Sequence, residues 1–188
     1  ELFVFLAVAA NTGARRGELC ALRWCDVSFE GSFVTFASAV VKGGGEGAVV
    51  RRTKTGAVTR VAVSARVLGV FETHRDRGVA LMEGLGLDFD DKRFIWSQDI
   101  EGARPIYPDT ITVRFRRLRS RHGLDHVELR QLRHYAATQL LSAGVDVRTV
   151  AGRLGHSRPA TTLDRYAAFL PERDREAAEI LDGVHRSR

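Results

Sequence analysis

The sequence predicts a single α+β domain that is predominantly helical and carries a small three-stranded antiparallel sheet. Both ends of the chain repeat apolar residues at helical spacing, whereas residues 33–63 consist of β-branched runs separated by glycine turns. The 188 residues contain no internal repeat and no low-complexity linker. A chain of this size buries roughly 70% of its unfolded surface. We therefore expect one domain over residues 1–188.

The N-terminal part predicts two helices. The first is expected at Leu2–Asn11, where apolar side chains dominate and Gly13 provides a stop. The second is shorter and carries Glu18, Leu19 and Leu22. The chain thus opens within a helical pattern, as expected for a segment that an upstream domain precedes.

Three runs rich in β-branched residues predict the strands of the sheet: residues 33–36, 49–52 and 58–63. Residues 43–47 are glycine-rich and are interpreted as a hairpin turn, and Thr55-Gly56 provides a second turn. Lys54 is expected at the tip of this second hairpin.

The remainder of the chain predicts helices. One is expected from Ser64 to about Leu85, followed by a short strand or buried loop at residues 93–96. Boundary residues indicate five more: Pro108 opens a helix at 108–121, Gly144 closes one begun near Leu129, Asp146 caps one that ends at Gly155, and two others would start at Pro159 and Pro171.

The composition excludes several classes of protein. No apolar run approaches the ~18 residues that span a bilayer, so no membrane partner is expected. Cys20 and Cys25 are the two cysteines, and no other His or Cys pair has zinc-ligand spacing, which favours reduced thiols, a cytoplasmic location and no metal. Sequence motifs of P-loop ATPases, nucleophile-elbow esterases and zinc proteases are missing. No cofactor is expected.

The charge of the chain favours a polyanionic partner. The net charge is +6, and between residues 104 and 133 eight arginines stand against three acidic residues. In the helix expected at 108–121, a buried stripe is formed by Ile111, Phe115 and Leu118. Another face carries Arg114, Arg117 and Arg121. We interpret these arginines as DNA-binding; a merely solvated face is the alternative.

Several residues are suited to holding and attacking a phosphate. The planar fork of Arg133 can grip two phosphate oxygens, His156 can hydrogen-bond a third, and the hydroxyl of Tyr166 can attack phosphorus. Arg15 and Arg16 lie between a helix stop and a helix start, where backbone N–H groups favour an anion. Taken alone, solvated arginines are the simpler interpretation; the alternative is that Glu18 orients one of them. Such a set suits phosphodiester cleavage without metal.

Lys54 is one of only three lysines in a chain with 26 arginines. A lysine can release a proton with a pKa of ~10.4, and neighbouring cations such as Arg51 and Arg52 lower that pKa, whereas an arginine effectively never releases one. Lys54 is therefore a candidate general acid, with an ordinary hairpin lysine as the alternative. Arg51 and Arg52 are candidate DNA contacts.

Taken together, these segments resemble the tyrosine recombinase family, the phage integrase and Xer type of DNA strand-exchange enzyme, over nearly the whole chain. Residues 12–24 are similar to the family's first arginine box and residues 53–56 to its hairpin lysine. Residues 132–141 resemble the second arginine box, and residues 154–162 resemble the run before the nucleophile. The resemblance implies catalytic positions at Arg15, Lys54, Arg130, Arg133, His156 and Tyr166.

The resemblance also implies a mechanism. Arg15 and Arg133 would hold the scissile phosphate of double-stranded DNA, and Tyr166 would attack it to form a 3′-phosphotyrosyl link. Lys54 would protonate the departing 5′ oxygen. Because the bond energy is kept in the covalent intermediate, neither ATP nor metal is needed.

One position departs from the family pattern. Arg130 stands where the family usually has a histidine that contacts the phosphate and accepts the nucleophile's proton; an arginine can do the first and not the second. The resemblance further implies that the N-terminal core-binding domain is absent from this chain. It implies a homotetramer on DNA, in which residues 171–184 dock onto a neighbouring subunit.

The leading functional interpretation is a site-specific recombinase, most simply the integrase of a phage or other mobile element. A type IB topoisomerase, which nicks and closes one strand by similar chemistry, is a second interpretation. A DNA-binding relic that has lost catalysis is a third, and Arg130 is the residue that keeps it open.

Overall fold

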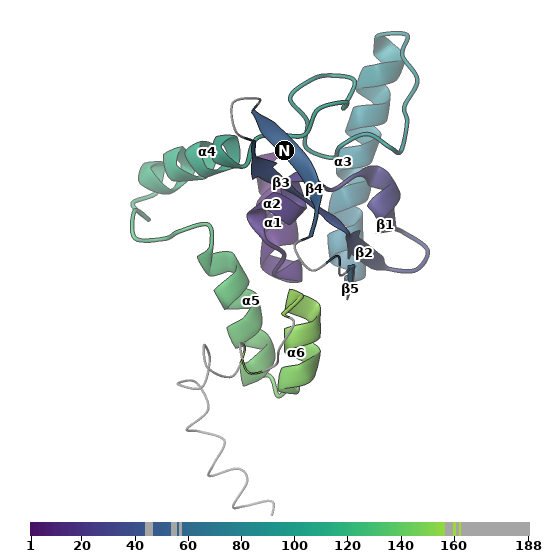
Figure 1. Ribbon diagram of the computed structural model, residues 1–188. Coiled ribbons are helices and arrows are strands. Elements are labelled where there is room, and N and C mark those ends of the chain that lie inside the picture. Colours follow the sequence, from purple (N-terminus) through teal and green to yellow (C-terminus); the bar gives the residue numbers. More distant parts are fainter. Residues whose placement is uncertain (44–46, 54–55, 57, 157–159, 161, 163–188) are drawn as a thin grey trace, which may run out of the picture.

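The computed structural model describes residues 1–43, 47–53, 56, 58–156, 160 and 162 (Figure 1). Its first helix, α1 (Leu2–Thr12), ends because Gly13 adopts a left-handed φ of 65° and turns the chain into α2 (Arg16–Cys20). This confirms the two predicted N-terminal helices. A side chain at Gly13 would meet Leu154, since an added Cβ would lie 2.6 Å from Leu154 Cδ2. The α1–α2 turn therefore packs tightly against the C-terminal part of the described chain.

The described strands form two separate antiparallel ladders. A three-stranded sheet has the order β1-β2-β5, from β1 (Val27–Ser28), β2 (Phe33–Phe36) and β5 (Thr59–Ala62). A two-stranded ladder pairs β3 (Ser38–Lys42) with β4 (Ala48–Arg52). Val34 lies opposite Val61 in the first ladder, and Val40 lies opposite Val50 in the second.

The membership of the sheet corrects the sequence prediction. Residues 33–36 and 59–62 do pair, but residues 49–52 pair with residues 38–42, which had not been predicted as a strand. The physical reason is local closure: β3 and β4 are neighbours in the sequence, so they pair at little entropic cost, and Gly43 N–H donates to Gly47 O at 2.7 Å beside the ladder. Strand β3 then lies on α2, where Gly17 leaves room for the carbonyl of Val40.

The remaining helices lie close to their predicted boundaries: α3 (Ala65–Gly84), α4 (Pro108–Arg121), α5 (Gln131–Ser142) and α6 (Val147–Leu154). The side chain of Asp146 caps α6 by accepting hydrogen bonds from the backbone N–H groups of Arg148 and Thr149, both at 3.0 Å. Gly155 ends that helix in the left-handed conformation. Residues 93–96 form a buried loop, with Phe94 bridged to Arg23, rather than a strand in either ladder.

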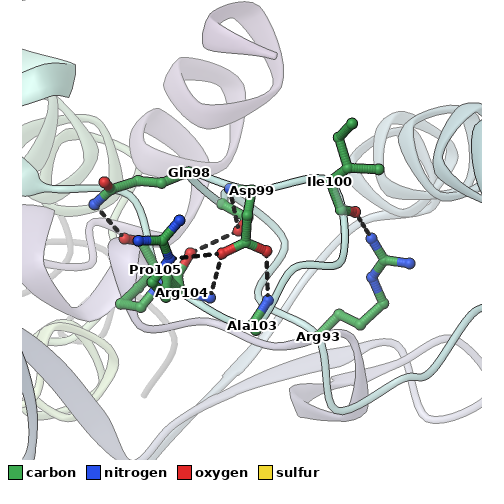
Figure 2. Close-up of polar contacts among 8 residues, drawn as sticks. Arg93, Gln98, Asp99, Ile100, Ala103, Arg104 and Pro105 are labelled. Carbon is green, nitrogen blue, oxygen red and sulfur yellow. Dashed lines mark hydrogen bonds and ion pairs between the residues drawn. The ribbon is translucent and has the colours of Figure 1, made fainter.

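A carboxylate organises the loop that leads into α4 (Figure 2). Asp99 accepts hydrogen bonds from Ala103 N at 2.8 Å, from Arg104 N at 3.0 Å and from Arg104 Nε at 3.1 Å. Gly102 closes the turn with a φ of 70°. Burial acts to raise the pKa of Asp99, but these hydrogen bonds prevail and hold it below its usual range. The loop thereby gives α4 a fixed start.

Two apolar clusters support the fold. The larger one joins α1, α2, α3, the three-stranded sheet and the 94–96 loop, and the ring of Phe5 meets that of Trp96 edge-on at 4.9 Å. The smaller one lies between α5 and α6 and is formed by Ala137, Leu141, Val150 and Leu154. In Figure 1 the α5–α6 pair lies at the lower end of α1, and α4 extends to one side. The α1–α2 turn is where the two clusters meet.

Helix α4 is amphipathic as predicted. Ile111 is fully buried and Phe115 and Leu118 are half-buried, whereas Arg114, Arg117 and Arg121 are exposed. Within the described part of the chain, no helix has both the length and the apolar character to cross a membrane.

Candidate active site

A cavity of about 580 Å³ lies between α1, α2, α4 and the start of α5. It brings together three predicted site residues, Arg15, Arg130 and Arg133. Among the described residues that line it, six are arginines and only Glu128 is acidic: the other arginines are Arg16, Arg116 and Arg119. The cavity is therefore strongly cationic and suits a phosphate group.

Arg15 is held in place by Glu18. The backbone N–H of Arg15 donates to Glu18 Oε2 at 2.7 Å, and its Nη1 donates to Glu18 Oε1 at 2.7 Å. The side chain of Glu18 is 11% exposed, whereas that of Arg15 is 52% exposed. The Glu18 carboxylate thus orients the Arg15 guanidinium and leaves part of that group exposed to solvent. This agrees with the orienting role that the sequence suggests for Glu18.

Arg133 joins two segments that are distant in sequence. From α5, its Nη1 donates to Gly13 O at 2.7 Å and its Nη2 donates to Leu154 O at 2.7 Å. Gly13 lies 120 residues before Arg133. A guanidinium carries five N–H donors, so these two bonds by themselves do not exclude a phosphate contact. Arg133 thus lines the cavity and also ties the α1–α2 turn to the end of α6.

Arg130 lies at the N-cap position of α5 and is ion-paired with Glu128. Its Nε lies 2.5 Å from Glu128 Oε2, and its side chain is 78% exposed. It shares the cavity with Arg133, as their spacing predicts. The sequence did not indicate this ion pair between Arg130 and Glu128. In it, the Glu128 carboxylate competes with a phosphate for the Arg130 guanidinium.

His156 follows the left-handed Gly155 at the end of α6. The Nδ1 of His156 lies 2.8 Å from the hydroxyl oxygen of Thr162, and Thr162 is fully buried. The backbone N–H of His156 donates to Ala151 O at 2.9 Å. Because Arg133 holds the carbonyl of Leu154, the main chain two residues before His156 is bonded directly to a cavity arginine.

Lys54 and Tyr166 lie outside the described residues. Next to Lys54, Gly56 N–H donates to Thr53 O at 2.8 Å. The strand that follows, β5, lies against the end of α6, because a Cβ added to Gly155 would lie 2.7 Å from Thr59 Oγ1. Strand β5 therefore lies beside the residue that precedes His156.

The predicted DNA-binding arginines have different surroundings. Arg51 and Arg52 are exposed at the end of β4, and Arg117 and Arg121 are exposed on α4. Arg114 is ion-paired, with its Nη1 2.9 Å from Glu1 Oε2. This pair joins distant parts of the sequence and could not be predicted from local spacing.

Three arginines of the cavity were not among the site residues that the sequence predicted. Arg116 and Arg119 line it together with Thr112, and their spacing of four and three residues along α4 is a signal that would have found them. Arg16 donates to the hydroxyl of Thr112 and lies 3.3 Å from Asp109 Oδ1. These contacts fix α4 beside α2.

The thiols and metal-ligand groups form no second centre in the described residues. Cys20 and Cys25 are both free thiols, and burial raises the pKa of Cys20 to about 12, so that it stays protonated. Within the part of the chain that the structure describes, no three or more His, Cys, Asp or Glu side chains are grouped as a metal site.

Comparison with known proteins identifies the family. The model of the phage integrase family matches residues 2–173, so the chain belongs to that family. The ICEBs1 integrase of Bacillus subtilis (strain 168) is 25% identical over 96% of this chain and 48% of its own length. Tyrosine recombinase XerA of Thermococcus onnurineus (strain NA1) is 30% identical over 93% of this chain and 54% of its own length.

Solved structures agree on the fold. The Tn1549 transposon integrase in complex with transposon right-end DNA superimposes with a TM-score of 0.76 at 23% identity, over 96% of this chain and 58% of that one. The XerA recombinase gives a TM-score of 0.64 at 24% identity, over 90% of this chain and 58% of that one. The chain spans about half the length of the curated relatives it matches.

Proposed function

We propose that this chain is the catalytic domain, over residues 1–188, of a tyrosine-type site-specific DNA recombinase. The observation that carries the proposal is the cavity in which Arg15, Arg130 and Arg133 converge from two distant segments. Membership of the phage integrase family supports it, as do the names of the relatives, which are integrases and tyrosine recombinases.

The proposed chemistry follows from the residue types. Arg15 and Arg133 stabilise the charge that develops on the scissile phosphate, and His156 adds a hydrogen bond. The Tyr166 hydroxyl attacks phosphorus to form a 3′-phosphotyrosyl bond, and Lys54 donates a proton to the 5′ oxygen that leaves. A DNA strand then reverses these steps to rejoin, and neither a metal nor a nucleotide takes part.

The proposed partner is double-stranded DNA. The six arginines of the cavity and the exposed arginines of α4 and β4 favour a phosphate backbone. The Tn1549 transposon integrase, which has the same fold, is in complex with transposon DNA. We further propose a cytoplasmic enzyme of a mobile element that acts as a homotetramer, with an N-terminal core-binding domain outside this chain.

The two alternatives are less well supported. The residue types that cleavage needs are all present in the sequence, as Arg15, Lys54, Arg133, His156 and Tyr166. A relic that has lost catalysis would not require them. A topoisomerase is not among the names of the relatives described above, which are recombinases and integrases. The recombinase therefore accounts for more of the observations.

Covalent trapping tests the proposal. The protein is incubated with a nicked duplex whose short product strand diffuses away after cleavage, so that the intermediate accumulates. The parent protein is expected to form an adduct that survives denaturant, and Tyr166→Phe is expected to form none while binding DNA normally. Tyr135→Phe, which removes the hydroxyl of an exposed tyrosine on α5, is the matched control and should form the adduct. An adduct with Tyr166→Phe would refute the assignment.

A further inference from the structure

A second arginine, Arg153, binds two distant main-chain carbonyls. It lies in the last turn of α6 and is half-buried. Its Nη1 donates to Ala62 O at 2.9 Å, and its Nη2 donates to Asn11 O at 2.8 Å. Asn11 belongs to the last turn of α1, where carbonyls have no partner within the helix, and Ala62 is the last residue of β5. Arg153 therefore fastens α6 to two other elements at once.

The next two residues have further tight contacts. The side chain of Leu154 is buried beside Gly13, and its carbonyl accepts the hydrogen bond from Arg133. Gly155 adopts a φ of 64°, and it lies so close to Thr59 of β5 that a Cβ at this position would be only 2.7 Å from Thr59 Oγ1. Three consecutive residues before His156 are thus packed or bonded against other segments of the fold. Their contacts fix the direction in which the chain enters His156.

We propose that Arg153 is a positioning residue for His156. Its two hydrogen bonds hold the end of α6 in place against α1 and β5. It acts through the main chain, because the described residues that line the cavity do not include it. The effect on cleavage rests on the proposed function, whereas the effect on His156 does not.

The chemistry of the guanidinium explains why arginine suits this position. Burial costs solvation of the cation and lowers the pKa of Arg153, and the two charge-assisted hydrogen bonds offset part of that cost. The Nε of Arg153 is buried and has no hydrogen-bond partner among the described residues. The carbonyl at the end of α1 also carries the negative end of the helix dipole. A lysine offers one compact charge and cannot bond two diverging carbonyls with the fixed geometry of a fork.

The first experiment measures cleavage in the full-length protein. Arg153→Met keeps most of the apolar stem and removes both donors, and Arg153→Lys keeps the charge. Arg148→Met, on the exposed first turn of the same helix, is the matched control. Single-turnover trapping is expected to slow by up to about 10²-fold in Arg153→Met, by less in Arg153→Lys, and not in Arg148→Met, with DNA affinity unchanged in all three. An unchanged rate in Arg153→Met would overturn the proposal.

A double-mutant cycle separates positioning from general loss of structure. If Arg153 acts through His156, then Arg153→Met should have little further effect on the cleavage rate once His156 has been replaced by Ala. If the two losses multiply in full, Arg153 does not act through His156 and the proposal fails.

A third measurement needs no cleavage. The ring ¹H–¹⁵N correlations of His156 report its hydrogen bond to Thr162 in the DNA-free chain. Arg153→Met is expected to shift these correlations, and Arg148→Met is not. Unshifted His156 signals in Arg153→Met would contradict the proposal. If the parent protein forms no covalent adduct, the proposed function fails, but this measurement still decides whether Arg153 positions His156.

Discussion

At the scale of single residues, the site depends on arginines that are held by partners inside the protein. Glu18 holds Arg15, main-chain carbonyls hold Arg133, and Glu128 pairs with Arg130. The first two arrangements preorganise cations toward the cavity, which avoids reorganisation when a phosphate binds. The third differs, because the Glu128 ion pair must loosen before Arg130 can donate to a phosphate.

We predict that Arg130→His raises the cleavage rate and that Arg130→Ala lowers it. A histidine supplies the base that an arginine cannot provide, and a positioned base contributes about 10²–10⁴ in rate, which is the upper bound on the gain. Alanine removes the phosphate hydrogen bond without replacing it. Trapping rates for the parent and both variants check this. An inert or inhibitory histidine would show that proton acceptance at this position does not limit the reaction.

We predict that Lys54→Ala slows cleavage by about 10²–10⁴, because a general acid for the leaving 5′ oxygen is lost. A substrate with sulfur in the 5′-bridging position leaves without protonation and should recover most of the rate. The comparison of oxygen and sulfur substrates for parent and Lys54→Ala measures this. Absence of recovery would indicate a purely electrostatic role for Lys54.

At the scale of elements, helix boundaries could be predicted because Gly13, Pro108, Asp146 and Gly155 act locally on the backbone. Strand pairing could not, because the partner of each strand is decided by contacts that the local pattern does not contain. For this reason β4 pairs with β3 in a separate hairpin, and β1 takes the place that the sequence prediction had given to β4 in the three-stranded sheet. The same limit hid the bonds from Arg133 and Arg153 to distant carbonyls.

We predict that Gly13→Ala destabilises the protein by about 1–3 kcal/mol, because alanine is strained at a φ of 65° and its Cβ would lie 2.6 Å from Leu154 Cδ2. Gly69→Ala in α3 is the control: a Cβ there meets no atom within 4 Å, and alanine should stabilise the helix by up to about 1 kcal/mol. Denaturant unfolding measures both. Equal effects of the two substitutions would contradict the close packing of α6 on the α1–α2 turn.

We predict that replacing Arg114, Arg117 and Arg121 together by Ala weakens binding to all DNA sequences similarly. The slope of log affinity against log salt should decrease in magnitude by about 0.9 for each DNA phosphate that is no longer neutralised. The Glu1 ion pair makes Arg114 the smallest contributor. Arg75→Ala, which removes an arginine paired with Asp91, is the control and should leave the slope unchanged. An unchanged slope in the triple variant would identify these arginines as a solvated face.

At the scale of the whole molecule, the cavity lies against the larger apolar cluster, and Arg133 connects it to the smaller cluster through its hydrogen bond to Leu154 O. The larger cluster positions Arg15, and the smaller one positions Arg133 and His156. Sequence motifs could predict that Arg15, Arg130 and Arg133 come together, whereas the bonds of Arg133 to distant carbonyls required the fold. Cleavage is therefore expected to depend on the docking of the α5–α6 pair as well as on the site residues.

The most direct test of the central claim compares a normal scissile phosphate with a neutral methylphosphonate. If Arg15 and Arg133 stabilise negative charge on the scissile group, Arg15→Ala and Arg133→Ala should lose a far larger factor in cleavage rate on the phosphate than on the methylphosphonate. Trapping rates for the parent and the two variants on both substrates give the comparison. Equal losses on the two substrates would contradict the account, because these arginines would then not act on the charge of the phosphate.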